Sequence, residues 1–475
     1  MLISFQDKLP NPIQKVGELQ VVKTPTVLVG RILDEFPSHV WSDKTKRWLV
    51  PVSKTGVFEV GIYRRLMLGL AAEFPNKEDR HRHIIYEMIW SVCPTRACEL
   101  LVRRNYLGRV WDNIREFEKL EGNVQTNNFL KMTINKNGEV MVKVDGKDKY
   151  VNFNCVVGNP PYQDNPKHGR SDPKNIYPDF VLQAMKLNPE YMSMVIPARW
   201  TTGAGKGSKS FLATMKDCGK LSKIVVEEDA SKWFPEVDIK GGVLYFLYDT
   251  TKSDSMISIN GVNVDLSDQD YIITDVVGIN IAKKVMLKST STFDQMMLKQ
   301  KAYGIETNHS IWSNDPDTSY VCHCSGGHGS GDVSHFIDHK LINKNVDTIP
   351  KWKVCCGSSS GEGKDGIGKT FLIGPNHIVT NSYNVMGVFD SEEIAANAES
   401  YLLLRLPQFL MSLLKITHHQ TAAVFKYVPY LDFTRSYTDQ ELYTMFDLSA
   451  DEIAHIEKMT NHFSMFRVNK RKIKS

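Results

Sequence analysis

Hydrophobic positions in the first half of the chain follow two alternating patterns. Short runs rich in β-branched residues predict buried strands, and apolar residues spaced three or four apart predict helices between them. Strands that alternate with helices favour a mostly parallel sheet with helices on its faces. The strands are expected at 48–50, 155–157, 191–196 and 224–226, with a hairpin over 237–247, and the helices at 25–33, 59–68 and 177–187.

The pattern changes after residue 250. A polar stretch without strand character, 250–255, is followed by short strands separated by Gly-rich loops. Helical spacing returns at 276–288, 392–414 and 450–459. The chain is therefore expected to hold an α/β domain over 1–252 and a second α/β or α+β domain over 253–475.

Composition narrows the class of protein only a little. Hydrophobic residues make up 42% of the chain and charged residues 24%, as in ordinary globular proteins, and the net charge of +4 is small for a nucleic-acid binder. Eight sparse cysteines, several in apolar runs, indicate a reducing compartment. The longest apolar run, 60–72, is interrupted by Arg64 and Arg65, and the amino terminus lacks a signal segment. We therefore expect a soluble cytoplasmic protein with no membrane partner.

The most informative stretch is Asn159-Pro160-Pro161-Tyr162, directly after the strand predicted at 155–157. Proline supplies no donor to a sheet, so the strand must end here in a stiff loop. The loop presents an amide oxygen, a backbone carbonyl and an aromatic ring. Two such oxygens accept the hydrogens of an exocyclic amine, while the ring stacks on the base that carries it. An adenine outside its duplex fits this arrangement, although the same tetrapeptide is also compatible with an ordinary strand-ending turn.

This tetrapeptide resembles the catalytic motif of DNA adenine-N6 methyltransferases, and its place well downstream of a candidate cofactor-binding stretch is similar to the γ arrangement of motifs in type II restriction-modification methylases. The resemblance implies a Rossmann-like catalytic domain over 1–252, with a mostly parallel seven-stranded sheet and S-adenosylmethionine as cofactor, and a DNA target-recognition domain with a basic tail over 253–475. It extends over nearly the whole chain and is strongest at 156–162 and 190–247.

The resemblance also implies residues that bind the cofactor. Thr24 and Pro25 match a pair that contacts the carboxylate end of the cofactor, although a plain helix cap explains them equally well on local evidence. A strand, a small-residue turn and a helix amino terminus form the usual approach to a nucleotide-type ligand. The matching residues of this turn are Pro51, Ser53, Gly56 and Phe58.

Two acids that the family uses for the cofactor are missing. Val50 stands where the first is expected, Lys54 replaces a small residue nearby, and the segment 89–95, where the second acid belongs, contains no carboxylate. Asn128 stands where an acid accepts a hydrogen bond from the cofactor's adenine, and its amide oxygen retains that capacity. We therefore expect weak binding of the free cofactor.

Contacts to DNA are expected from aromatic and basic residues. Phe234, with Trp233 as its neighbour, matches the aromatic that sandwiches the flipped base opposite the catalytic tyrosine, although paired aromatics are often core. Gly-rich loops and a basic carboxy-terminal tail supply the phosphate and base contacts. The lysines and arginine singled out are Lys206, Lys209, Lys364, Lys369, Lys470 and Arg471.

Two patterns in the second half are interpreted as coincidental. Residues 363–370 satisfy the spacing of a phosphate-binding loop, but a strand-like run follows where that loop requires a helix. Cys322-His323-Cys324 lacks the spacing of a zinc site and alternates as a half-buried strand does, so no metal is expected.

The sequence thus predicts a site-specific methyltransferase that acts on N6 of a flipped adenine in double-stranded DNA, in a bacterial or phage-infected cell. A separate restriction endonuclease is a partner that the resemblance leaves open, and a nuclease within this chain is not expected. One alternative is a degenerate DNA-binding protein that no longer uses the cofactor. Another is methylation of RNA or of a protein amide, which shares the tetrapeptide.

Overall fold

The computed structural model divides into two compact units, Met1–Thr274 and Asp275–Ser475. The described residues are 23–107, 123–144, 146–164, 174–203, 207–237, 239, 241–267, 270–308, 312–325, 332–360, 365–415 and 418–463, together with the two-residue strands β1 (Lys15–Val16) and β2 (Leu19–Gln20). No helix among these residues is both long and apolar enough to cross a bilayer.

The first unit is built on a nine-stranded sheet in the order β13-β12-β10-β11-β9-β8-β3-β4-β5. Its centre is parallel, with β11 antiparallel to both neighbours. The central strands β3, β8 and β9 are buried along their whole length, which explains their unbroken apolar sequences. Seven of the strands are β3 (Trp48–Val50), β4 (Ile89–Cys93), β5 (Val124–Thr126), β8 (Cys155–Gly158), β9 (Tyr191–Pro197), β10 (Leu221–Glu227) and β11 (Val243–Asp249). The α/β class and the mostly parallel sheet expected from the sequence are confirmed.

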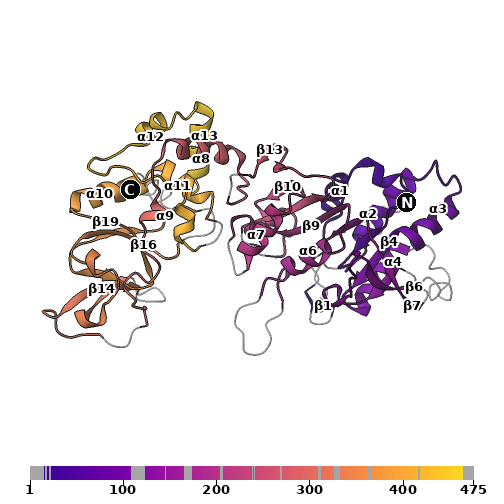
Figure 1. Ribbon diagram of the computed structural model, residues 1–475, viewed down its shortest axis with the longest axis horizontal. Coiled ribbons are helices and arrows are strands. Elements are labelled where there is room, and N and C mark those ends of the chain that lie inside the picture. The colour runs from indigo at the N-terminus through magenta and orange to yellow at the C-terminus, as the bar shows by residue number, and fades with distance from the viewer. Residues whose placement is uncertain are drawn as a thin grey trace, which may run out of the picture. The chain divides into compact units, whose positions relative to one another are not determined.

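Helices flank this sheet, as Figure 1 shows for the indigo to magenta part of the chain. The helices α1 and α4 pack against α2, and the buried side chains of all three join one core cluster with β3 and β4. The helices are α1 (Thr26–Asp34), α2 (Val57–Gly69), α3 (Lys77–His83), α4 (Arg96–Leu107), α6 (Tyr177–Met185) and α7 (Ser208–Asp217), and a π-helical turn at Ile84–Met88 follows α3. A separate hairpin is formed by β6 (Val140–Val144) and β7 (Lys147–Val151).

The first unit extends beyond the boundary expected at residue 252. The strands β12 (Met256–Ile259) and β13 (Val262–Asp265) form a hairpin, and β12 pairs in parallel with β10. Ile257 and Ile259 are buried in this extension, so the hairpin belongs to the large sheet. The unit therefore ends at Thr274, and the sheet has nine strands instead of seven.

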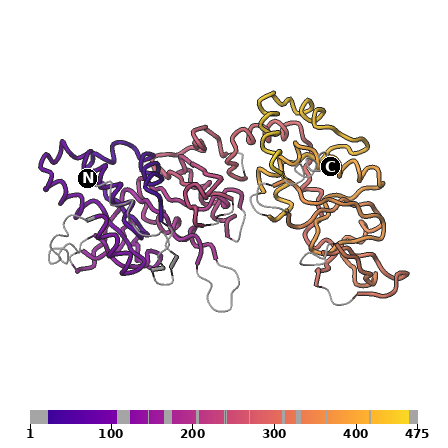
Figure 2. Tube along the Cα trace, turned by 180° about the vertical axis from the view of Figure 1, so that it is seen from behind, coloured from indigo at the N-terminus to yellow at the C-terminus, as the bar shows by residue number. Residues whose placement is uncertain are grey.

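The second unit combines two three-stranded sheets with helices, coloured orange to yellow in Figure 2. One sheet holds β14 (Ser319–Ser325), β15 (Asp332–Asp338) and β18 (His377–Val379), and the other β16 (Trp352–Gly357), β17 (Thr370–Ile373) and β19 (Tyr383–Phe389). The helices are α8 (Val276–Lys288), α9 (Phe293–Met296), α10 (Glu392–Leu402), α11 (Arg405–Ser412), α12 (Asp439–Met445) and α13 (Ala450–Thr460). The single helix expected over 392–414 is thus two helices.

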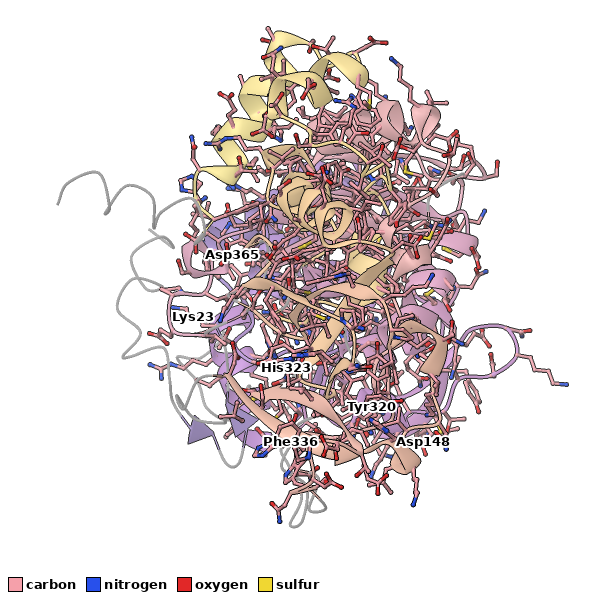
Figure 3. The ribbon with its side chains drawn as sticks, turned by 90° about the vertical axis from the view of Figure 1, so that its left-hand side faces the viewer. Lys23, Asp148, Tyr320, His323, Phe336 and Asp365 are labelled. Carbon is pink, nitrogen blue, oxygen red and sulfur yellow. The ribbon has the colours of Figure 1, made fainter. Side chains whose placement is uncertain are left out.

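The Cys322-His323-Cys324 segment forms part of β14, as its alternation predicts. Both cysteines are buried, while His323 stacks on His377 of β18 with ring centroids 5.1 Å apart. His323 and Tyr320 on β14 and Phe336 on β15 are labelled in Figure 3. The phosphate-binding-loop spacing at 363–370 is followed by strand β17 and not by a helix, which removes the context that such a loop needs.

Candidate active site

The site lies at the point in the central sheet where the chain stops adding strands on one side of β3 and crosses to the other side. From β3 the chain continues through β4 and β5 on one side, and then crosses to β8 and β9 on the other. Ligands of such folds bind at the carboxyl ends of the strands at this switch point. Pro51 follows β3 there and Asn159 follows β8. The two strand ends are close together, since a Cβ added to Gly158 would lie 3.5 Å from Cδ of Pro51.

The turn between β3 and α2 is held in place by its backbone. The N–H of Ser53 donates to the carbonyl of Val92 in β4 at 2.8 Å, and the side chain of Asn105 in α4 donates to the carbonyl of Thr55 at 2.8 Å. Gly56 has a φ of 80°, which favours glycine, and α2 begins at the next residue. The amino terminus of α2 is therefore fixed beside the switch point. Phe58 is buried in the core cluster, and Pro51 is also buried.

The two polar side-chain atoms of Asn159 differ: one donates a hydrogen bond, and the other has no partner among the described residues. Its side chain is 5% exposed, and Nδ2 donates to Oγ1 of Thr24 at 3.1 Å. Its Oδ1 is buried and has no hydrogen-bond partner among the described residues. An unpaired buried acceptor costs free energy unless a ligand supplies a donor. Asn159 is thus held by Thr24 with its acceptor available.

The Thr24–Pro25 pair is not the helix cap that local sequence also suggested. Pro25 is the N-cap residue of α1 and no side chain caps this helix end. Thr24 is buried and its hydroxyl accepts from Asn159. This contact joins two motifs that lie 135 positions apart in the sequence.

The aromatic residues of the motif pack against the central core. Pro160 is buried, Pro161 and Tyr162 are half-buried, and the Tyr162 carbonyl accepts from the N–H of Ile176 at 3.0 Å. The Tyr162 hydroxyl is buried and has no hydrogen-bond partner in the described part of the chain, and burial raises its pKa. Tyr162 packs against the core cluster that also contains Trp233 and Phe234.

The two candidate stacking residues are both buried in this structure. Phe234 is 2% exposed, and Trp233 is 8% exposed and stacks on Tyr245 with ring centroids 5.9 Å apart. A base could therefore contact Phe234 only if side chains around it moved.

A small cavity connects the candidate cofactor residues. Its volume is about 20 Å³, and its lining comes from Thr24, the segment 52–59 and Asn159. This space holds roughly one water molecule, so a cofactor requires outward movement of lining side chains. The unpaired atoms Oδ1 of Asn159 and Oε2 of Glu59 both belong to residues that line it. These acceptors fit the amino and hydroxyl donors of S-adenosylmethionine.

Glu59 is a site residue that the sequence interpretation missed. It lies in the first turn of α2, is fully buried, and Oε1 accepts from the Ser91 hydroxyl at 2.7 Å. Burial raises the pKa of Glu59, although the hydroxyls of Ser53 and Ser91 act in the opposite direction. The signal available in the sequence was a carboxylate inside the apolar run Val57-Phe58-Glu59-Val60.

Asn128 does not present its amide oxygen freely. It is exposed and caps the short 3-10 helix Phe129–Lys131 by accepting from the N–H of Leu130 at 3.0 Å. Its neighbour Asn127 lines a larger cavity of about 580 Å³ between α4, β5 and the β6–β7 hairpin. This cavity has a polar lining that includes Arg96, Glu99, Arg103, Lys131 and Lys143.

Of the candidate DNA-binding residues, the described ones are Lys209 and Lys369. Lys209 is exposed in the first turn of α7. Lys369 precedes β17 and pairs with Asp332 of β15 at 2.8 Å, with 77% of its side chain exposed. The remaining ones, Lys206, Lys364, Lys470 and Arg471, lie outside the described residues.

The comparison with protein families agrees with the motif at Asn159. Residues 64–234 match the Eco57I restriction-modification methylase family. The methylase resemblance seen in the sequence is confirmed. The Eco57I match contains Asn159 to Tyr162 and ends at Phe234, while Thr24 and the turn at 51–56 lie before it. An uncharacterized adenine-specific methylase of Mycoplasma pneumoniae (strain ATCC 29342 / M129 / Subtype 1) is 29% identical over 289 residues, which cover 50% of this chain and 68% of that protein.

Solved structures of restriction-modification enzymes are more distant. A nuclease-deletion mutant of the Type ISP enzyme LlaGI, in complex with a DNA substrate mimic, has 11% identity and a TM-score of 0.48, over 84% of this chain and 45% of that chain. The type IIG restriction endonuclease BpuSI has 10% identity and a TM-score of 0.40, over 94% of this chain and 65% of that chain. The chain thus spans less than two thirds of either enzyme. The strand order of the central sheet alone carries the α/β fold of the first unit.

Proposed function

We propose that this chain transfers a methyl group from S-adenosylmethionine to N6 of adenine at specific sites in double-stranded DNA, as part of a restriction-modification or phage-related modification system. The Eco57I family match and the adenine-specific methylase homologue support the reaction type. The observation that carries the proposal is the buried, unpaired Oδ1 of Asn159 at the switch point of the sheet. A separate restriction endonuclease is the natural partner of such an enzyme.

The proposed chemistry needs two acceptors and a stacking surface. Oδ1 of Asn159 and the carbonyl of Pro160 accept the two hydrogens of the adenine amine, which orients its lone pair toward the methyl donor. The ring of Tyr162 supports the base from one side, with Phe234 as the candidate for the other. S-adenosylmethionine would supply the methyl group: its S–CH3 bond would break as the bond from the methyl carbon to N6 forms, S-adenosylhomocysteine would leave, and the proton lost from N6 would pass to water. Because the acceptors are buried, the adenine must leave its duplex to reach them.

The direct test measures methylation of unmodified DNA by the purified chain with labelled S-adenosylmethionine. We expect N6-methyladenine to accumulate at one short sequence motif. Transfer of the label to RNA or protein, and not to DNA, would contradict the proposal. Calorimetric titration of S-adenosylmethionine distinguishes the degenerate DNA-binding alternative, for which no heat of binding is expected.

Thr24 is expected to act as a positioning residue for Asn159. The substitution Thr24→Val removes the acceptor of the Asn159 amide but no helix cap, because Thr24 does not cap α1. Loss of one buried hydrogen bond is worth about 1 kcal/mol, so turnover should fall roughly fivefold to tenfold. Single-turnover rates give the result, and Thr24→Ser should restore most of the rate. Equal rates for Thr24→Val and wild type would show that this contact does not position Asn159.

Lys369 is expected to contribute to the choice of DNA site. It is exposed, and its ion pair with Asp332 is a surface pair that stabilises the fold by less than about 1 kcal/mol. Lys369→Ala should therefore leave folding intact while it changes the set of methylated sequences. Long-read mapping of methylated adenines in a methylation-free host measures this set. Lys351→Ala is the matched control, because Lys351 also forms an exposed ion pair in this unit, with Asp390. An unchanged motif in Lys369→Ala would exclude a role in recognition.

A further inference from the structure

A buried carboxylate lies in the candidate cofactor cavity without a cationic partner. Glu59 lines this cavity with Thr24 and Asn159, and its side chain is inaccessible to solvent. Oε1 accepts from the hydroxyl of Ser91, but Oε2 has no hydrogen-bond partner among the described residues. A carboxylate in this state is costly unless a ligand pairs with it.

Glu59 occupies the place of the acids that the sequence lacks. Val50, which stands at the first missing position, pairs in register with Ser91 of β4. Ser91 precedes Cys93 by two positions at the end of the same strand, and the second acid is missing there. Because Oε1 of Glu59 accepts from Ser91, its carboxylate lies beside the middle of β4, level with Val50 at the end of β3. An acid from the helix that follows β3 thus lies beside Ser91, one strand away from Val50, where the sequence resemblance implied an acid.

Among the residues that the structure describes, no cation forms an ion pair with Glu59. The titratable groups that face it are the Cys93 thiol of β4 and the Tyr106 hydroxyl of α4, and burial together with the Glu59 charge raises the pKa of both. Neither group is a cation. Lys54 lines the same cavity but forms no hydrogen bond or ion pair with Glu59. Proteins retain uncompensated buried charges of this kind mainly where function requires them.

We infer that Glu59 binds the α-ammonium group at the methionine end of S-adenosylmethionine. This inference rests on the proposed function. The methionine end is favoured because the cavity also contains Asn159, which must lie beside the transferred methyl group, and the methyl-bearing sulfur belongs to that end. Pairing of carboxylate with ammonium also supplies the missing partner of Oε2.

Calorimetric titration with three ligands tests the assignment. S-adenosylmethionine and S-adenosylhomocysteine both carry the α-ammonium, whereas 5′-methylthioadenosine keeps the adenine, ribose and sulfur but lacks the amino acid. Glu59→Gln should lower the affinity for the first two ligands by roughly tenfold to a hundredfold, which is the range expected for loss of a charge-assisted hydrogen bond. The affinity for 5′-methylthioadenosine should not change. Glu190→Gln is the control, because Glu190 pairs with Lys46 at the opposite, amino end of β9.

Two results would overturn the inference. Equal loss of affinity for all three ligands would show that Glu59 contacts the ribose or the adenine. Unchanged affinity for all three would show that Glu59 contacts no part of the ligand. If wild type binds S-adenosylmethionine and Glu59→Gln binds it equally well, only this inference fails. If wild type binds none of the ligands, the proposed function fails with it.

Stability of the free protein separates a binding role from a structural one. With no cationic partner for the carboxylate, Glu59→Gln should make the ligand-free protein more resistant to urea at pH 7.5. The pKa of Glu59 is raised in the folded state, so charging it costs stability as the pH rises above the ordinary value of 4.5. The advantage of the variant should therefore vanish below about pH 4.5, where the side chain is neutral in both states. A variant less stable than wild type at pH 7.5 would indicate a structural residue and contradict the inference.

Discussion

Replacing Asn159 with alanine is expected to lower the rate of DNA methylation by at least about a hundredfold, equivalent to roughly 3 kcal/mol of transition-state stabilisation. The reason is that Oδ1 is the buried acceptor at the switch point, and alanine offers none. Affinity for DNA should change little, because this amide acts on the reacting amine and not on the phosphate backbone. Single-turnover methylation with labelled cofactor measures the rate, and filter binding measures the affinity.

The matched control for this prediction is Asn152→Ala. Asn152 also carries an amide but is exposed before the amino end of β8, where its Oδ1 accepts from Arg47 at 2.8 Å. It should methylate DNA at the wild-type rate. Near-normal turnover of Asn159→Ala would refute the proposed role of the motif, and a parallel loss of DNA affinity would indicate that the amide shapes the binding surface instead.

The part of the site that sequence could predict is the part encoded by rigid local chemistry. Two prolines after an apolar strand force its end, so Asn159 had to stand at the carboxyl end of a strand. The turn at 51–56 was also predictable from local sequence. A glycine just before a helix indicates a positive φ, and Gly56 has one. Neither pattern reveals that Thr24 bonds to Asn159, since that contact depends on how α1 packs against the sheet.

The missed features depend on tertiary structure. Glu59 resembles an ordinary helix residue in sequence, and only its hydrogen bond to Ser91, which pairs with Val50, shows that its carboxylate reaches β4 beside the end of β3. The hairpin of β12 and β13 follows a polar stretch that resembles a linker, and its pairing with β10 moves the unit boundary to Thr274. The break between α10 and α11 at Leu403–Leu404 carries no glycine, but Pro407 in the first turn of α11 was a local signal against one continuous helix over 392–414.

A second buried acid in the same unit, Glu99, differs from Glu59 in its hydrogen-bond partners. Glu99 of α4 is 3% exposed, and its carboxylate accepts from Arg103 at 2.9 Å, Arg96 at 2.5 Å and the Thr126 hydroxyl at 2.6 Å. Burial acts to raise the pKa of Glu99, but these hydrogen bonds outweigh it and the pKa is lowered. Both carboxylate oxygens of Glu99 thus accept hydrogen bonds within the protein, whereas Oε2 of Glu59 accepts none from the residues that the structure describes.

Glu99→Gln is therefore expected to destabilise the protein by roughly 3 kcal/mol at pH 7.5, because it leaves the guanidinium of Arg103, 5% exposed, buried without its counter-charge. The lowered pKa means that the ionised carboxylate stabilises the fold above the ordinary value of 4.5, and that this contribution is lost as the pH falls through the folded-state value. Urea unfolding at pH 7.5 and at pH 4 measures both effects, and the deficit of the variant should shrink in acid. The same isosteric change thus destabilises the fold at Glu99 and stabilises it at Glu59. Equal effects at the two positions would show that the free Oε2 of Glu59 has an internal partner, and would remove the physical reason to expect a ligand there.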